Sequence, residues 1–150
     1  MTEAIIGPAT AADIDLVEAL LEREHLPLAG LRDHGEYVLV ARAGNRIVGC
    51  AALELYEDGA LLRSLAVEAE HRGSGLGSEL THAALRMADT RGMPAVYLLT
   101  TTAERFFPRF GFEVVDRADV PHSVRQSVEF SYACPSSALV MRKRHPDPEP

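Results

Sequence analysis

The chain contains no tryptophan and only two cysteines, Cys50 and Cys134, in 150 residues. Two cysteines cannot form a disulfide framework, and this usage is typical of a reducing compartment. No apolar run approaches the roughly 20 residues that span a bilayer, and the N-terminus lacks the basic start of a signal peptide. We therefore expect a cytoplasmic protein without a membrane partner.

Positive charge is scarce and scattered. The chain has 15 basic and 22 acidic residues, a net charge of −7, and a single lysine, Lys143. This balance argues against an extended nucleic-acid surface and against a histone or tRNA substrate. The six histidines show no spacing typical of metal ligands, so we expect no metal; they are His25, His34, His71, His82, His122 and His145.

The length and composition predict one globular domain. A chain of this length buries a large share of its surface, and 47% of its residues are hydrophobic. We expect a single domain over residues 1–144 and a frayed, proline-rich tail over 145–150.

A glycine-rich run, Arg72-Gly73-Ser74-Gly75-Leu76-Gly77, lies between an apolar segment (61–67) and a helix-like segment (78–91). Glycines let backbone N–H groups crowd toward an anion, and a helix start adds unpaired donors, so the run is typical of pyrophosphate binding. Its spacing fits neither the dinucleotide fingerprint nor the Gly-Lys-Ser/Thr ending of a nucleotide-kinase loop. A tight turn without a ligand is the alternative.

Arg72, Gly75 and Gly77 resemble the acetyl-CoA loop, Arg/Gln-x-x-Gly-x-Gly/Ala, of the GCN5-related N-acetyltransferases (GNAT). Val67 before the loop and Gly111-Phe112 after a short helix match the family in the same order. A narrower resemblance is to the arsenic-resistance N-acetyltransferases, some of which acetylate amino-acid-like organoarsenicals. It is carried by Leu62-Arg63-Ser64-Leu65, residues 98–103, Phe106-Phe107, Glu129-Phe130 and Cys134-Pro135.

The resemblance implies a mixed α/β fold, with a strongly bent sheet of six or seven strands flanked by about four helices. It also implies that the fourth strand splays from the fifth, so that the Leu65 N–H faces the thioester carbonyl and Val67 bonds the pantetheine. The implied acetyl-CoA contacts are Leu65, Ala66, Val67, Arg72, Gly73, Ser74, Gly75, Leu76, Gly77, Ser78 and Phe107.

The pattern of apolar residues places the elements. A capping box at Thr10-Ala11-Ala12-Asp13 opens a helix that runs to about Glu24, and the helix over 78–91 ends at Gly92. Residues 25–34 form a loop or short helix beside the site. Strands are expected at 37–41, 47–55, 61–67, 96–100 and 112–115, with a last strand or pair from 128–132 and 138–141.

Two carboxylates are candidates for the general base. Glu54 lies late in the third strand, and Glu129 heads an otherwise apolar segment. Apolar surroundings raise the pKa of a carboxylate, which suits it to accept a proton from an ammonium group. The alternatives for both are a salt bridge to Arg63 or Arg117, or solvent exposure.

The chain departs from the family pattern at the position of the proton donor. The family's usual acid is a tyrosine at the position of Phe107, and a phenylalanine ring cannot donate a proton. We expect this ring to pack near the CoA sulfur. The substitutes that we consider are Cys134, Tyr132, Tyr97, Ser64 and water, or departure of the thiolate without help.

Arg63 lies in a central strand and needs an anionic partner, because an unpaired buried charge is too costly. The partner is either an internal glutamate or, as we prefer, a substrate carboxylate. Thr100, Thr101 and Thr102 end the fifth strand and offer hydroxyls to the substrate, although at least one of them should cap the following helix. Cys50 is expected to be a small core residue.

These features together predict acetyl-CoA-dependent N-acetylation of a small amino-acid-like amine, by direct attack in a ternary complex. An organoarsenical or a related toxic glutamate mimic is the narrower candidate, which would make the activity one of arsenic resistance. Two alternatives are kept: an acetyltransferase for a polyamine or a protein N-terminus, and a CoA-binding sensor that has lost turnover. A homodimer is left open.

Overall fold

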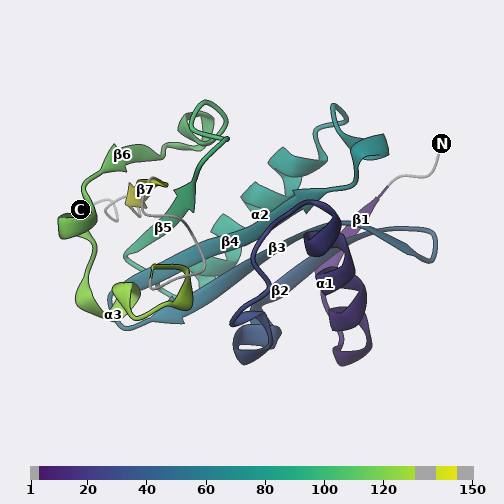
Figure 1. Ribbon diagram of the computed structural model, residues 1–150, viewed down its shortest axis with the longest axis horizontal. Coiled ribbons are helices and arrows are strands. Elements are labelled where there is room, and N and C mark those ends of the chain that lie inside the picture. Colours follow the sequence, from purple (N-terminus) through teal and green to yellow (C-terminus); the bar gives the residue numbers. More distant parts are fainter. Residues whose placement is uncertain (1–3, 131–137, 145–150) are drawn as a thin grey trace.

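Seven strands form one mixed sheet in the computed structural model, which describes residues 4–130 and 138–144 (Figure 1). Their order is β1-β2-β3-β4-β5-β7-β6, and only β4 and β5 are parallel neighbours. The expected mixed sheet is thereby confirmed. The strands are β1 (Ile5–Pro8), β2 (Val38–Ala43), β3 (Arg46–Tyr56), β4 (Gly59–Val67), β5 (Ala95–Thr100), β6 (Glu113–Val115) and β7 (Leu139–Arg144).

The described residues form three α-helices: α1 (Ile14–Arg23), α2 (Leu76–Thr90) and α3 (His122–Arg125). The capping box before α1 is present, because the Thr10 N–H donates to Asp13 Oδ2 at 2.7 Å. The short helix expected before Gly111 is a 3-10 turn, Phe107–Phe110, so the number of α-helices is smaller than expected. None of the described helices is long and apolar enough to cross a membrane.

Helices cover both faces of the sheet, and each face has its own hydrophobic core. The apolar side of α2, with Leu80 and Ala84, packs on Val48 and Leu53 of β3. The apolar side of α1 packs on the opposite face, in a cluster that includes Cys50 of the same strand. Figure 1 shows α1 and α2 on the two sides of the long central strands. Alternating residues of β3 therefore serve the two cores.

Two elements differ from the expectation. Strand β1, which pairs with β2, was missing from the predicted elements. The predicted strand over 128–132 is wrong in its described part, because 128–130 are helical and the Phe130 N–H bonds the Ser127 carbonyl at 3.0 Å. A short apolar run cannot tell a strand from a buried helical turn. The rest of that segment, the Cys134-Pro135 turn and the tail 145–150 lie outside the described residues.

The sheet opens at its centre. Strands β4 and β5 pair only at Ala60 with Val96 and Leu61 with Tyr97, so the rest of β4 has a free edge toward β5. On its other edge β4 carries a bulge, in which residues 64–65 oppose the single residue Ala51 of β3. The structure thus has the predicted splay, and a bulge bends β4 at the same point.

Candidate active site

A cavity of about 280 Å³ lies where β4 leaves β5, and we call it the inner cavity. Its wall combines the loop after α1, the second half of β4, the end of β5 with the turn that follows, one residue after α3 and one residue before β7. The lining residues are His25, Leu26, Pro27, Leu62, Arg63, Ser64, Leu65, Leu98, Leu99, Thr100, Thr101, Thr102, Ala103, Phe106, Phe107, Glu129 and Ala138.

A second cavity of about 420 Å³, the outer groove, lies over the start of α2. Phe106 lines both cavities, so they adjoin at its ring. The residues that line the outer groove are Val67, His71, Arg72, Gly73, Gly75, Leu76, Gly77, Ser78, Phe106 and Arg109. The glycine run and the end of β4, predicted to hold acetyl-CoA, therefore share one surface.

The glycine run gives the outer groove an exposed helix start. Gly75 is the N-cap of α2 and has a φ of 86°, a left-handed conformation that glycine adopts without strain. No side chain caps this helix start. The first backbone N–H groups of α2 therefore remain for an anion, with the positive end of the helix dipole behind them.

The two arginines of the outer groove, Arg72 and Arg109, differ in how far their charge is compensated. Arg72 forms an ion pair with Glu24 and donates to the Val67 carbonyl at 3.2 Å, so its charge is already partly compensated. Arg109, which the sequence analysis missed, stacks on Phe106 at 5.6 Å and forms no ion pair with any described residue. Its place two positions before Gly111, close to the family's Gly-Phe pair, could have marked this basic residue as a candidate for the groove.

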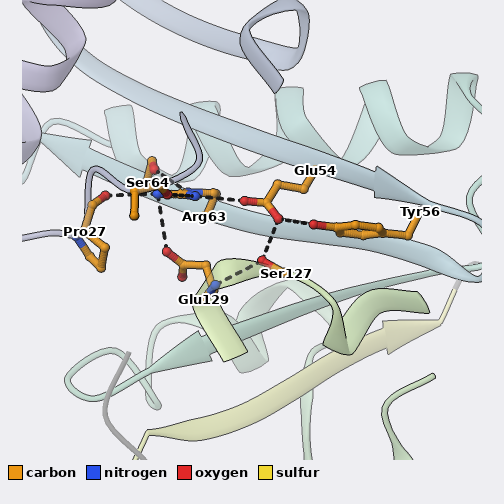
Figure 2. Close-up of polar contacts among 8 residues, drawn as sticks. Pro27, Glu54, Tyr56, Arg63, Ser64, Ser127 and Glu129 are labelled. Atoms are coloured by element: carbon orange, nitrogen blue, oxygen red, sulfur yellow. Dashed lines mark hydrogen bonds and ion pairs between the residues drawn. The ribbon is translucent and has the colours of Figure 1, made fainter. Parts of the chain in front are cut away.

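At the wall of the inner cavity, a buried guanidinium binds two carboxylates, and Figure 2 shows these contacts. Arg63 Nη1 donates to Glu54 Oε2 at 2.8 Å, and Arg63 Nη2 lies 3.4 Å from Glu129 Oε2. The Arg63 and Glu54 side chains are each 1% exposed. The partners of Arg63 are thus internal glutamates, the first of the two alternatives considered.

The remaining donors of Arg63 are also used. Its Nε donates to Ser64 Oγ at 3.1 Å, Nη1 to the Ala29 carbonyl at 2.6 Å, and Nη2 to the Pro27 carbonyl at 3.0 Å. A guanidinium has five N–H groups, and Arg63 has five acceptors within reach. A substrate carboxylate could bind it only by displacing one of them, so the preferred substrate contact of Arg63 stays a prediction that this geometry does not favour.

Glu54 is fully engaged as well. Its Oε1 accepts hydrogen bonds from Ser127 Oγ at 2.6 Å and from the Tyr56 hydroxyl. Burial raises the pKa of Glu54, but the bonds from Ser127, Tyr56 and Arg63, with the charge of Arg63, outweigh it and lower the pKa. The raised pKa expected for Glu54 is therefore wrong. Glu54 does not line the inner cavity, and its proposed role as a base has no support from this position.

Glu129 is the carboxylate that reaches the inner cavity. It is 5% exposed, it lines the cavity wall, and its backbone N–H donates to Ser127 Oγ at 3.2 Å. Because Ser127 also donates to Glu54, one hydroxyl links the two carboxylate-bearing segments (Figure 2). Of the two predicted bases, only Glu129 stands where an acceptor amine could approach.

The threonines and Phe107 line the inner cavity as predicted, with distinct surroundings. Thr100 Oγ1 accepts from the Ala103 N–H at 2.9 Å and so stabilises the turn after β5, whereas the short 3-10 helix at Phe107–Phe110 has Phe106 as its N-cap and no side-chain cap, so the capping role expected of a threonine is wrong. Thr101 and Thr102 are exposed at the cavity wall. Phe107 is buried against Phe106, with ring centres 5.1 Å apart.

Cys50 is the one cysteine among the described residues. Cys50 is buried, its thiol donates to the Ser64 carbonyl at 3.1 Å, and burial raises the pKa of the thiol to about 12. It is the core residue that was expected. Cys134, the candidate proton donor, and Tyr132 lie outside the described residues. In the described ranges, no three His, Cys, Asp or Glu side chains gather as a metal site would require.

Two residues around the cavity have unusual backbone conformations. His25 and Ser64 both have a φ of 59°, and no other described residue except glycine has a positive φ. Both line the inner cavity. Strained residues of this kind concentrate at functional sites. His25 begins the segment 25–34 that the sequence placed beside the site, and the structure puts it on the cavity wall.

Comparison with known proteins links this chain to the GNAT family of acetyltransferases. Residues 34–114 match the family model of the acetyltransferase (GNAT) domain. An amino-acid acetyltransferase of Pasteurella multocida is 30% identical over 142 residues, which cover 88% of this chain and 32% of that protein. An amino-acid acetyltransferase of Mannheimia succiniciproducens is 30% identical over 110 residues, 72% of this chain and 24% of that protein. The chain thus spans a third or less of the length of these relatives.

Solved structures share the fold. N-acetylglutamate synthase from Neisseria gonorrhoeae, complexed with coenzyme A and N-acetyl-glutamate, superposes with a TM-score of 0.81 at 22% identity, over 96% of this chain and 35% of that one. A Mycobacterium tuberculosis protein, Rv2747, in complex with CoA superposes with a TM-score of 0.80 at 23% identity, over 94% of this chain and 99% of that one.

Proposed function

This chain belongs to the GNAT family of acetyltransferases, and from that premise we propose that it transfers the acetyl group of acetyl-CoA to the amine of a small amino-acid-like molecule. One observation carries the proposal: a groove suited to an anion and a cavity with a carboxylate wall adjoin at Phe106. Relatives named amino-acid acetyltransferase, and a neighbour that holds N-acetyl-glutamate, support the substrate class.

The acyl donor would occupy both cavities. Its diphosphate would bind the N–H groups at the start of α2 in the outer groove. Its pantetheine arm would run along the free edge of β4, bonding the backbone of Val67, and its thioester would enter the inner cavity next to the Leu65 N–H. An unpaired strand edge offers the amide hydrogen bonds that an extended arm needs.

The acceptor would enter the inner cavity as an ammonium ion. Glu129 would take its proton, and the free amine would then attack the thioester carbonyl. The oxygen of the tetrahedral intermediate would be stabilised by the Leu65 N–H. As the intermediate collapses, the carbon–sulfur bond breaks and the second proton of the attacking nitrogen passes to solvent, which releases the CoA thiolate and the neutral N-acetylated product.

Phe107 lines the inner cavity at the position of the family's usual tyrosine, and no tyrosine lines this cavity among the described residues. Cys134 stays a candidate proton donor, together with water. A thiolate is a good leaving group near neutral pH, since the pKa of an ordinary thiol is about 8.5. The missing tyrosine is therefore compatible with turnover.

The substrate side chain and carboxylate would meet hydroxyl groups. Thr101 and Thr102 are exposed at the wall of the inner cavity, whereas the donors of Arg63 are occupied. The narrower proposal of an organoarsenical or a toxic glutamate mimic rests on the sequence resemblance alone. A polyamine or a protein N-terminus is the competing acceptor.

Thiol release from acetyl-CoA in the presence of an amine panel tests the function. The panel contains glutamate, other amino acids, an organoarsenical amino acid, spermidine and a short peptide, and mass spectrometry identifies the product. We expect release with the amino-acid-like amines and the matching N-acetyl products. Calorimetric binding of acetyl-CoA without release for any amine would instead favour a CoA sensor, the function that Phe107 suggests.

A further inference from the structure

Arg63 connects segments that are far apart in the chain and that both supply wall of the inner cavity; Figure 2 shows its contacts with Pro27 and Glu129. Its guanidinium holds the carbonyls of Pro27 and Ala29 in the loop after α1. The same group contacts Glu129, which follows α3. The loop and Glu129 both supply cavity wall, so a single side chain ties the two walls together.

The packing around Gly30 shows how tightly the loop is held. Gly30 has a φ of 80°, and a Cβ at this position would lie 2.7 Å from Val128 Cγ1 and 3.2 Å from Arg63 Nη1. The loop backbone therefore rests directly on the guanidinium and on the segment that carries Glu129. This contact is independent of the hydrogen bonds of Arg63.

Glu54 makes the burial of this charge tolerable. Its bond to Arg63 is the shorter of the two carboxylate contacts, 2.8 Å against 3.4 Å for Glu129. Tyr56 and Ser127 donate hydrogen bonds to Glu54 Oε1, so the position of Glu54 does not depend on any group in the cavity. Glu54 thus compensates the charge of Arg63 while Glu129 remains at the wall.

We propose that Arg63 is a positioning residue of the acceptor site, which fixes the loop 25–30 and Glu129 on their two walls, with Glu54 as its counter-ion. This inference rests on the proposed function, because it takes the inner cavity as the place of the acceptor amine. It differs from the carboxylate-binding role, in which Arg63 would touch the substrate itself.

Amide hydrogen exchange tests the positioning role without any substrate. In Arg63→Met we expect exchange at residues 25–30 and 127–130 to rise together by tenfold or more, while α2 keeps its protection. Arg42→Met is the matched control, because it breaks the ion pair between Arg42 and Asp13 away from the cavity. Unchanged exchange in both segments of Arg63→Met would overturn the proposal.

Gly30→Ala provides a second variant, which displaces the loop and keeps every charge. We expect it to raise exchange in the same two segments, so the proposal remains testable if Arg63→Met does not fold. Rigid walls in Gly30→Ala would count against the proposal, because the loop would then be held by something other than its contact with the guanidinium.

Kinetics separate positioning from substrate binding. For an accepted amino acid and its carboxamide, which lacks the free carboxylate, we expect Arg63→Met to lower kcat/KM by the same factor, with the KM for acetyl-CoA changed less than twofold. Gly30→Ala should give the same pattern. A loss confined to the amino acid would overturn the proposal in favour of carboxylate binding. If the parent protein acetylates no amine, the proposed function fails, and hydrogen exchange alone decides the positioning role.

Discussion

The outer groove and the inner cavity are constructed in opposite ways. The outer groove comes mostly from one contiguous stretch, residues 67–78, and presents backbone N–H groups and exposed side chains. The inner cavity draws its wall from five separate parts of the chain and has a buried ionic network behind it. A diphosphate needs only local backbone, whereas a particular amine needs side chains held at fixed places.

The two constructions also differ in what a substitution should do. In the outer groove the main ion pair, between Arg72 and Glu24, is exposed, so losing it should leave the fold intact. Around Arg63 each lost partner leaves a buried charge or carbonyl unsatisfied, which is expensive. We therefore expect donor binding and acceptor chemistry to respond separately to variants in the two places.

The largest effect should come from Glu129→Gln in the inner cavity. Removal of a general base typically costs about 10²- to 10⁴-fold in rate, and we expect kcat to fall within this range. The KM for acetyl-CoA should stay within twofold, because the outer groove is untouched. Steady-state kinetics over a pH range provide the measurement.

A full rate in Glu129→Gln would remove the residue from the mechanism. Glu54→Gln is the matched control, since Glu54 does not line the cavity. If Glu129→Gln kept the acid limb of the pH–rate profile and Glu54→Gln lost it, the assignment of base and counter-ion would have to be reversed.

Gly75→Asp should weaken binding in the outer groove and leave the inner cavity unchanged. A carboxylate at the start of α2 opposes the diphosphate, and we expect acetyl-CoA to bind about 100-fold more weakly, or about 2.7 kcal/mol. Calorimetry measures this directly. Gly75→Ala is the control for backbone strain: a Cβ there meets no atom within 4 Å, although the φ of 86° remains unfavourable. Equal affinities in Gly75→Asp and the parent would mean that the groove is not the donor site.

The difference between the two places explains how much the sequence could predict. The glycine run, Val67 and the strand that precedes them form a local pattern, so the residues of the outer groove followed from spacing and resemblance, and the splayed sheet followed from the resemblance. The ion pairs of Arg63 with Glu54 and Glu129 were only one of the alternatives that the sequence left open, and the contact with the Pro27 carbonyl was not predicted, because these partners lie up to 66 positions away. The sequence does not show which buried groups lie close together in space. The raised pKa expected for Glu54 is wrong for this reason, because it took no account of Arg63, Tyr56 and Ser127.

Position 129 shows a second limit. Its surroundings in the sequence are apolar, which predicted a strand, and yet residues 128–130 are helical. A local hydrogen bond, in which the Glu129 N–H donates to Ser127 Oγ, competes with strand pairing and stabilises the helical backbone there. Glu129 nevertheless reaches the cavity wall, so the residue was predicted while its backbone was not.

Acid should loosen the inner cavity before the outer groove. The pKa of Glu54 is lowered from its ordinary value of 4.5, so its contribution to stability is complete above that pH and is lost as the pH falls through the lower folded pKa. A hydrogen bond to a charged group is worth about 1.5 to 3 kcal/mol, and we expect the lower end. Hydrogen exchange below pH 4.5 should therefore rise at residues 25–30 before it rises in α2.

Glu54→Gln should remove this pH dependence, because glutamine does not titrate. The protection factors of residues 25–30, which correct for the pH dependence of the intrinsic exchange rate, should in this variant be the same at pH 7 and pH 4. If α2 and the loop opened together in the parent, the ionic network would not be what distinguishes the two places.

Within the outer groove, Arg109→Gln should cost more donor affinity than Arg72→Gln. A phosphate must displace Glu24 before it can bind Arg72, whereas Arg109 has no ion pair among the described residues. We expect the Kd for acetyl-CoA to rise about tenfold in Arg109→Gln, or about 1.4 kcal/mol, and about threefold in Arg72→Gln. With S-acetylpantetheine, which has no phosphate, both variants should match the parent. A larger loss in Arg72→Gln would restore that arginine as the main cation.

The smallest effect should come from Phe107→Tyr, which restores a hydroxyl where the two cavities approach each other. Phe107 is buried between Phe106 and Phe112, so the nearly isosteric change should fold normally. A general acid is typically worth about 10²-fold or more, and a real shortage of protons would therefore appear as a large gain in kcat. We expect kcat to stay within about threefold, because a thiolate departs readily without protonation. Cys134→Ser is the companion variant: if it keeps full kcat across the pH range, Cys134 loses its role as the proton donor. A gain of 10²-fold in Phe107→Tyr would instead show that proton supply limits the inner cavity.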